Sequence, residues 1–137
     1  MIAALLLLAS VTATDKTPAA ARAVVARYYD AIEHGRYRVA YRLWSGDGRA
    51  SGKSFAAFVE GFARTAHSRV ATGTPVDGEG AAGSTFITVP VTVTATLKNG
   101  RRQRFHGSYT LRRVNDVPGA TPTQLRWHIA SARLRAA

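Results

Sequence analysis

The stretch FITVPVTVTATLKNGRRQRFHGSYTLRRV, residues 86–114, decides the fold of this chain. Apolar side chains alternate with polar ones from Ile87 to Leu97, which is the period of a half-buried β-strand. Asn99-Gly100 is a strong hairpin signal. The sequence therefore predicts two long antiparallel strands, over about 86–97 and 101–114.

The length of the hairpin loop sets which side chains share a face. A two-residue turn would place apolar residues opposite polar ones. A three-residue loop over 98–100, with Gly100 in the left-handed conformation, pairs apolar with apolar residues: Val93 with Phe105, Val89 with Tyr109, and Ile87 with Leu111. Because a one-residue slip turns every side chain to the other face, we predict the three-residue loop.

The first half of the chain has helical spacing. Thr17-Pro18 is typical of a helix N-cap followed by proline at the first helical position. The apolar pattern predicts three short helices, over Ala20–Glu33, Tyr37–Trp44 and Phe55–Phe62. Two further strands are predicted over 67–76 and 124–134. Pro90, inside a predicted strand, indicates an edge position or a bulge.

Helices that come first and antiparallel strands that follow predict an α+β fold, with three N-terminal helices packed on a curved antiparallel sheet of about four strands. It resembles the nuclear transport factor 2-like superfamily, the cone-shaped fold shared by ketosteroid isomerases and scytalone dehydratase. The resemblance lies in the run VVARYYDAI of the first helix, the two following helices, the long hairpin and the closing Trp127-His128-Ile129. It implies a pocket between the helices and the concave face of the sheet.

The N-terminus is typical of export. Residues 2–9 form an apolar run, and Val11-Thr12-Ala13 has small residues at both recognition positions of a signal peptidase. We expect a signal peptide over 1–13, a mature domain over 14–137 and a periplasmic or secreted protein. The alternative is a buried N-terminal helix or strand. The apolar run is too short for a membrane span, and none is expected after signal removal.

Composition excludes several classes of site. The 137 residues suit one domain, and the absence of cysteine excludes disulfides, zinc–cysteine sites and a cysteine nucleophile. The net charge of +11 suits anionic partners, but the 16 Arg and 3 Lys are spread along the whole chain. The four histidines, His34, His67, His106 and His128, have no metal-ligand spacing. No metal or other cofactor is indicated.

Two patterns bear on catalysis. The run from Asp47 to Ser54 is one residue short of a phosphate-binding loop, but a helix and not a strand precedes it, so we interpret it as a connection. An isomerase or dehydratase needs a carboxylate inside an apolar pocket. Only Asp30, Glu33 and Glu60 lie near the expected core. The sequence therefore leans against an enzyme, and the acid–base alternative depends on Asp30 or Glu60 projecting inward.

Aromatic side chains are the candidate binding residues. Seven of them are predicted to point between the helices and the sheet: Tyr28, Trp44, Phe58, Phe62, Phe105, Tyr109 and Trp127. Tyrosine and tryptophan bring polar groups to an apolar wall, which suits a small apolar ligand; the alternative is a filled core. The leading hypothesis is an exported, non-catalytic accessory or small-ligand-binding domain of the bacterial envelope.

The outward face of the sheet gives a further alternative. It is predicted to carry Arg102, Arg104, His106, Arg112, Arg126 and His128, separated by serine and threonine. Without aromatic residues among them, nucleic acid is not favoured as a partner. Anionic polymers or lipid could associate electrostatically with this face. A homodimer through it is implied by the resemblance, although the positive charges oppose it.

Overall fold

The computed structural model describes residues 15–78, 80 and 83–137. Three helices come first: α1 (Pro18–Glu33), α2 (Tyr37–Arg42) and α3 (Phe55–Glu60), with the 3-10 turn η2 (Arg49–Ser51) before α3. The strands follow: β1 (Thr65–Thr72), β2 (Val76–Asp77), β3 (Ser84–Leu97), β4 (Arg102–Val114) and β5 (His128–Ala136). The predicted leader, residues 1–13, lies outside the described residues, and the domain boundary after it stays a prediction.

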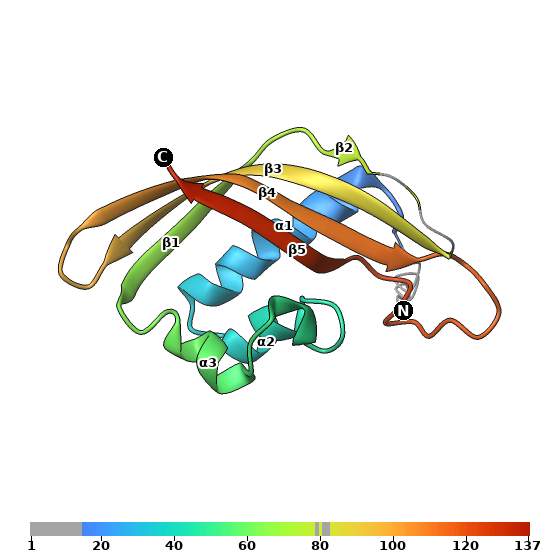
Figure 1. Cartoon of the computed structure of the whole chain (residues 1–137), viewed down its shortest axis with the longest axis horizontal. Helices are drawn as coiled ribbons and strands as arrows, with labels where there is room; N and C mark the ends of the chain where they lie inside the picture. Colours follow the sequence, from blue (N-terminus) through green and yellow to red (C-terminus); the bar gives the residue numbers. More distant parts are fainter. Residues whose placement is uncertain (1–14, 79, 81–82) are drawn as a thin grey trace, which may run out of the picture.

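The sheet is antiparallel and curves over the helices (Figure 1). Its order is β1-β3-β4-β5, and the short β2 also pairs with β3. The core lies between the concave face of the sheet and the three helices. The predicted α+β class is confirmed, with five strands where about four were expected.

The predicted hairpin register is confirmed. Val93 lies opposite Phe105, and Val89 lies opposite Tyr109. The three residues 98–100 form the loop, and Gly100 has φ +88°. Asn99 Oδ1 accepts a hydrogen bond from the Arg101 backbone N–H at 2.9 Å, which fixes the turn. The choice of register therefore places the valines of β3 and the aromatics of β4 on one buried face.

Pro90 is in a central strand, so the expected edge position is wrong. Its carbonyl accepts from the Gly73 N–H at 2.8 Å, which shows that its backbone polar groups face β1 and β2. β1 stops pairing at Val91, and β2 begins pairing at Thr88. The missing N–H of Pro90 thus falls just past the end of the β1 ladder and before the β2 pairing begins.

The helix α2 ends earlier than its apolar spacing predicts. The helix stops at Arg42, and the chain then runs beside β5. Ile129 donates its N–H to the Leu43 carbonyl at 2.7 Å, and the Ser45 N–H donates to the Ile129 carbonyl at 2.8 Å. These bonds satisfy the backbone N–H and carbonyl of Ile129 at the start of β5, on the edge that faces away from β4.

Other boundaries also differ from the predicted ones. The expected strand over 67–76 divides into β1 and the separate β2, and the last strand begins at His128 and not at 124. The segment just before His128 instead forms turns, closed by hydrogen bonds between Thr121 and Gln124. Among the described residues, no helix is long and apolar enough to cross a membrane.

Candidate functional site: an aromatic interior and a basic exterior

The structure brings most of the predicted aromatic residues into one core. Five of the seven are buried: Tyr28, Trp44, Phe58, Tyr109 and Trp127. Phe62 and Phe105 pack against this core and are half-buried. We define the aromatic cluster as these seven residues together with Tyr29, which the prediction omitted. Helical spacing placed Tyr29 on the same apolar face as Tyr28, so the signal for it was present in the sequence.

Rings in the cluster contact one another in edge-to-face and tilted arrangements. The centroid of Tyr28 lies 6.1 Å from Trp44, 6.3 Å from Phe58 and 5.9 Å from Tyr109. Phe58 lies 5.2 Å from Phe62, at the margin of the cluster. Such distances are those of packed aromatic pairs. The aromatic residues therefore form a continuous path from the margin to the centre, and their rings fill much of the interior.

A pair of hydroxyl groups lies at the centre of this cluster. The Tyr29 and Tyr109 hydroxyl oxygens are 2.5 Å apart and share a hydrogen bond. Burial raises the pKa of Tyr29 to about 12, and it raises the pKa of Tyr109 further. Both side chains therefore stay neutral at physiological pH. They can donate or accept a hydrogen bond, but they do not supply a base near pH 7.

Two buried indole N–H groups have no hydrogen-bond partner among the described residues. They belong to Trp44 and Trp127, which are 8% and 3% exposed. Burial raises the pKa of Tyr28, and the nearby Trp44 opposes this shift. The contact between the two side chains nevertheless falls short of hydrogen-bond geometry, so we count the Trp44 N–H as unpaired. A buried donor without an acceptor costs about 1–3 kcal/mol.

The carboxylates do not enter the interior. Asp30 and Glu60, on which the acid–base alternative depends, are both exposed. Glu33 is half-buried, but it is engaged at the strand β1: it accepts from the Ser68 backbone N–H at 2.8 Å and lies 3.0 Å from Nδ1 of His67. The backbone hydrogen bond, with a smaller effect of His67, lowers the pKa of Glu33. The inward carboxylate that the acid–base alternative requires is therefore absent at both positions.

Sequence reasoning missed the Glu33–His67 contact. The two residues are 34 positions apart, and only the packing of α1 on β1 joins them. No local spacing predicts such a pair. In the described part of the chain, no group of three or more His, Asp or Glu side chains could hold a metal ion.

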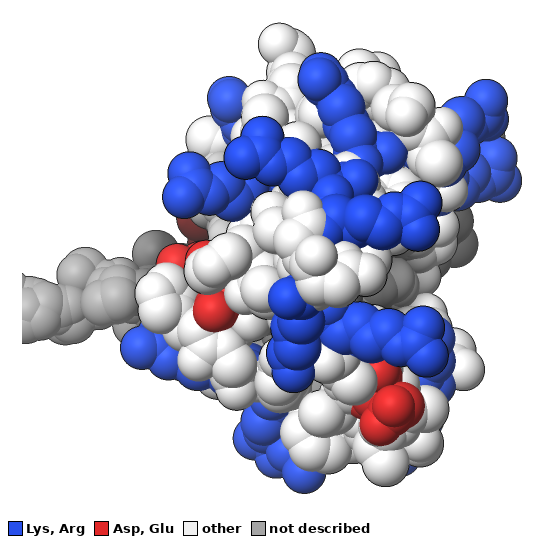
Figure 2. All heavy atoms as spheres, turned by 90° about the vertical axis from the view of Figure 1, so that its left-hand side faces the viewer, with Lys and Arg blue, Asp and Glu red and all other residues white. Residues whose placement is uncertain are grey.

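The convex face of the sheet is strongly basic. The four long strands contain no Asp or Glu, and all their residues are described. Alternation along the strands places six arginines on the face opposite the core: Arg69, Arg102, Arg104, Arg112, Arg133 and Arg135. We call this set the basic face. Figure 2 shows the end of the molecule that carries the β3–β4 hairpin, where Lys and Arg greatly outnumber Asp and Glu.

The predicted outward residues agree in part with this face. Arg102, Arg104 and Arg112 lie on it as expected, whereas Arg126 is exposed but precedes β5. The prediction omitted Arg69, Arg133 and Arg135. Phe86 lies opposite Arg112 in the register, so the face also has one aromatic residue that the prediction did not place there.

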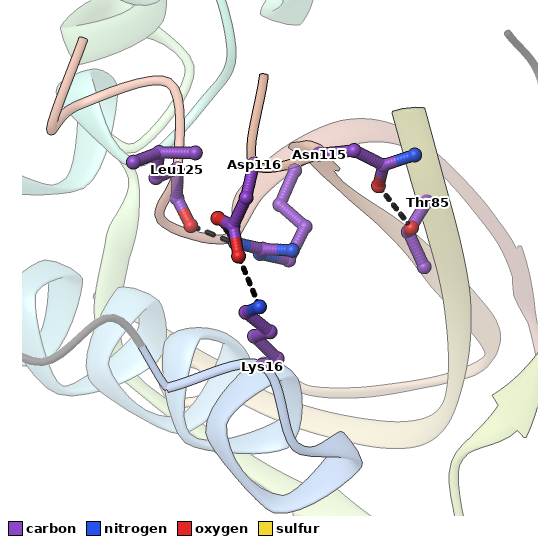
Figure 3. Close-up of polar contacts among 6 residues, drawn as sticks. Lys16, Thr85, Asn115, Asp116 and Leu125 are labelled. Atoms are coloured by element: carbon purple, nitrogen blue, oxygen red, sulfur yellow. Dashed lines mark hydrogen bonds and ion pairs between the residues drawn. The ribbon is translucent and has the colours of Figure 1, made fainter. Parts of the chain in front are cut away.

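The segment that joins β4 to β5 is fixed by Arg113. This arginine is only 4% exposed and donates Nε to the Leu125 carbonyl at 3.0 Å and Nη2 to Asp116 at 3.2 Å. Lys16 also pairs with Asp116 (Figure 3). Beside these contacts, the Thr85 hydroxyl donates to Asn115 Oδ1 at 2.6 Å. The segment after β4 is thus held against both the residues that precede α1 and the strand β3.

The run from Asp47 to Ser54 is a helix–helix connection, as interpreted. It contains η2, and Gly48 has φ +101°. A Cβ at Gly48 would lie 2.1 Å from the ring of Tyr41, so the glycine is needed both for its conformation and for the close approach. The Tyr41 hydroxyl donates to the Lys53 carbonyl at 2.6 Å, which closes the loop.

Comparisons with known proteins support the fold. No family model and no curated protein matches the sequence. Among solved structures, a "putative aromatic ring hydroxylase" from Novosphingobium aromaticivorans is similar, with 14% identity, a TM-score of 0.60, and coverage of 88% of this chain and 92% of that one.

Two further structures are similar at the same level. The Kfla4162 protein from Kribbella flavida shares 18% identity, with a TM-score of 0.59 over 87% of this chain and 89% of that one. Aln2 from a Streptomyces species shares 14% identity, with a TM-score of 0.51 and coverage of 86% of this chain and 88% of that one. The chain therefore shares the α+β fold of these three solved structures, and its core contains a buried aromatic cluster.

Proposed function

We propose that this protein is a non-catalytic binding domain whose aromatic cluster takes up a small, ring-containing ligand with a hydrogen-bond acceptor. We also propose that it is exported to the bacterial envelope, on the strength of residues 2–13. The exposure of Asp30 and Glu60 supports a binding role over acid–base catalysis. The name of the Novosphingobium neighbour refers to aromatic rings, which agrees with the proposed ligand class.

The observation that carries this proposal is the pair of unpaired indole N–H groups. Trp44 pairs with Ile129, two residues after Trp127, so both indoles come from neighbouring segments. Buried donors are nearly always satisfied in folded proteins, and an unsatisfied one calls for an explanation. A ligand carbonyl or ether oxygen in the cluster would supply the missing acceptor. An unsubstituted hydrocarbon would not.

The margin of the cluster is the proposed entrance. Tyr37 and Phe62 stack there with centroids 5.7 Å apart, and both are half-buried. With Ile32 they line a hollow of about 170 Å³. Phe62 also contacts Phe58, so displacement of the stacked pair opens the path toward Tyr28. Because the rings already fill much of the interior, binding requires them to move.

The experiment compares two probes of nearly equal size. We expect 2-acetylnaphthalene, which has an acceptor, to bind about tenfold more tightly than 2-ethylnaphthalene in isothermal titration, since one buried hydrogen bond is worth about 1 kcal/mol or more. Trp44→Phe and Trp127→Phe remove one donor each and should reduce this preference. Equal affinity for both probes, or a preference unchanged in both variants, would contradict the proposal.

A second candidate function rests on the basic face. Six arginines and no carboxylate on its strands favour a flexible polyanion, such as an anionic envelope polymer. We expect polyphosphate to bind with an affinity that falls steeply as salt rises. Arg102→Gln with Arg104→Gln should weaken binding more than Arg22→Gln with Arg27→Gln, which removes the same charge from α1. Equal losses of affinity in the two double variants would contradict this choice of partner. Tighter binding to anionic vesicles than to polyphosphate would also contradict it.

A further inference from the structure

A cleft separate from the aromatic cluster lies where the α2–η2 loop meets the start of β5 and the end of β4. Its volume is about 680 Å³. Its lining residues include Arg42, Asp47, Arg49, Arg112, Gln124 and His128. Clefts of about 300–1,000 Å³ are the usual size of small-molecule sites. This cleft is therefore large enough for a metabolite.

The charge of the cleft is positive. Arg42, Arg49 and Arg112 line it and are exposed, whereas Asp47 is the one carboxylate among its described lining residues. A fourth arginine, Arg113, also lines the cleft, but it is buried and its charge is paired with Asp116. The three exposed guanidinium groups thus outnumber the single carboxylate.

Each of the three arginines is held at one atom. Arg112 donates Nε to Ser84 Oγ at 3.0 Å, and Arg49 donates Nη1 to the Gly46 carbonyl at 3.1 Å. Arg42 pairs with Asp47 through Nε at 3.6 Å. No other hydrogen bond joins these three guanidinium groups to a described residue. Their remaining N–H groups can therefore form the forked contacts that phosphate and carboxylate groups accept.

His128 adds an acceptor to the cleft. Its Nδ1 lies 3.1 Å from the Arg126 carbonyl, which assigns the proton to Nδ1 and leaves the lone pair on Nε2. Burial lowers the pKa of His128, so the ring is neutral near pH 7. A neutral Nε2 accepts a hydrogen bond from a hydroxyl group. Gln124 accepts the Thr121 N–H through Oε1, and its amide NH₂ remains a donor.

We propose that this cleft binds a small phosphorylated polyhydroxy compound, with its phosphate between Arg42, Arg49 and Arg112 and a hydroxyl group on His128. A phosphate dianion matches three guanidinium groups better than a single carboxylate does. The inference is independent of ligand binding in the aromatic cluster. It shares only Arg112 with the basic face, so the two anion-binding roles can be separated by substitution.

Isothermal titration at constant ionic strength tests this cleft. The probes are glucose 6-phosphate, inorganic phosphate, citrate and glucose. We expect glucose 6-phosphate to bind more tightly than inorganic phosphate, and glucose to show no binding. Arg49→Gln should weaken glucose 6-phosphate binding about tenfold, as expected for loss of a charge-assisted hydrogen bond. Arg27→Gln, an exposed arginine on α1, is the matched control and should change it less than twofold.

A second variant tests the hydroxyl contact. His128→Phe should remove the preference for glucose 6-phosphate over inorganic phosphate while inorganic phosphate still binds. Equal effects of Arg49→Gln and Arg27→Gln would overturn the proposal, because net charge alone would then explain binding. Tighter binding of citrate than of glucose 6-phosphate, or absence of glucose 6-phosphate binding, would also overturn it. Circular dichroism of each variant checks that it is folded.

Discussion

Tyr29 and Tyr109, 80 residues apart in the sequence, share a buried hydrogen bond between their hydroxyl groups. The bond joins α1 to β4 across the core, and the two rings also lie edge to face with centroids 6.0 Å apart. Each buried hydroxyl therefore depends on the other for its hydrogen bond. This dependence can be measured.

The hydroxyl pair predicts non-additive stability. Tyr29→Phe or Tyr109→Phe alone leaves one buried hydroxyl without a partner and should cost about 1–2 kcal/mol in the free energy of unfolding. The double variant should cost less than the sum of the two single costs. Urea unfolding measures all four proteins. Tyr41→Phe combined with Tyr109→Phe is the control and should be additive, since the Tyr41 hydroxyl bonds Lys53.

The Glu33 contact predicts part of the acid sensitivity. Its folded pKa lies below the unfolded value of about 4.3, so the contact stabilises the protein above that pH and the stabilisation is lost as pH falls through the folded pKa. Glu33→Gln keeps an acceptor for the Ser68 N–H but cannot titrate. The stability difference between the native protein and this variant should therefore shrink between about pH 5 and pH 3. A difference that stays constant would show that the carboxylate charge has no role.

Gly107 predicts a strict size limit between β4 and β5. A Cβ at this position would lie 1.8 Å from the Arg133 carbonyl oxygen, and backbone atoms cannot yield as a flexible side chain does. Gly107→Ala should cost about 1–3 kcal/mol in the free energy of unfolding, through displacement of β5. Ser108→Ala, its neighbour on the opposite face, should cost about 0.5 kcal/mol or less. Equal melting temperatures for the two variants would contradict the close approach.

Much of the fold follows from local patterns. The Thr17 cap, the period of β3 and the loop at Gly100 each depend on neighbouring residues, so the sequence predicts them correctly. The early end of α2 is different. Trp44 has helical spacing, but its neighbours Leu43 and Ser45 form hydrogen bonds with Ile129, more than 80 residues later, and so turn the chain out of the helix. Pairing over such a distance leaves no local signal.

The candidate sites also differ in whether a local sequence pattern predicts them. Apolar spacing found the aromatic cluster because burial has a period in the sequence. The cleft at Arg49 and His128 was not found, since its walls come from three separate segments that carry no shared motif. Arg133 and Arg135 could have been found, because they alternate with Ala132, Leu134 and Ala136 along the last strand. The bulge between Thr110 and Leu111 in the β4–β5 pairing shifts this alternation relative to Ile129, so the pattern does not continue from the start of the strand.

The indole N–H groups give the most direct test of ligand binding in the core. The protein has two tryptophans, so its ¹⁵N spectrum should show two resolved indole signals, one from Trp44 and one from Trp127. Titration with 2-acetylnaphthalene should move both signals downfield as each N–H gains an acceptor, and 2-ethylnaphthalene should move them much less. The account would be contradicted if backbone amide signals shifted on addition of the ketone, which shows that it binds, while both indole signals stayed in place.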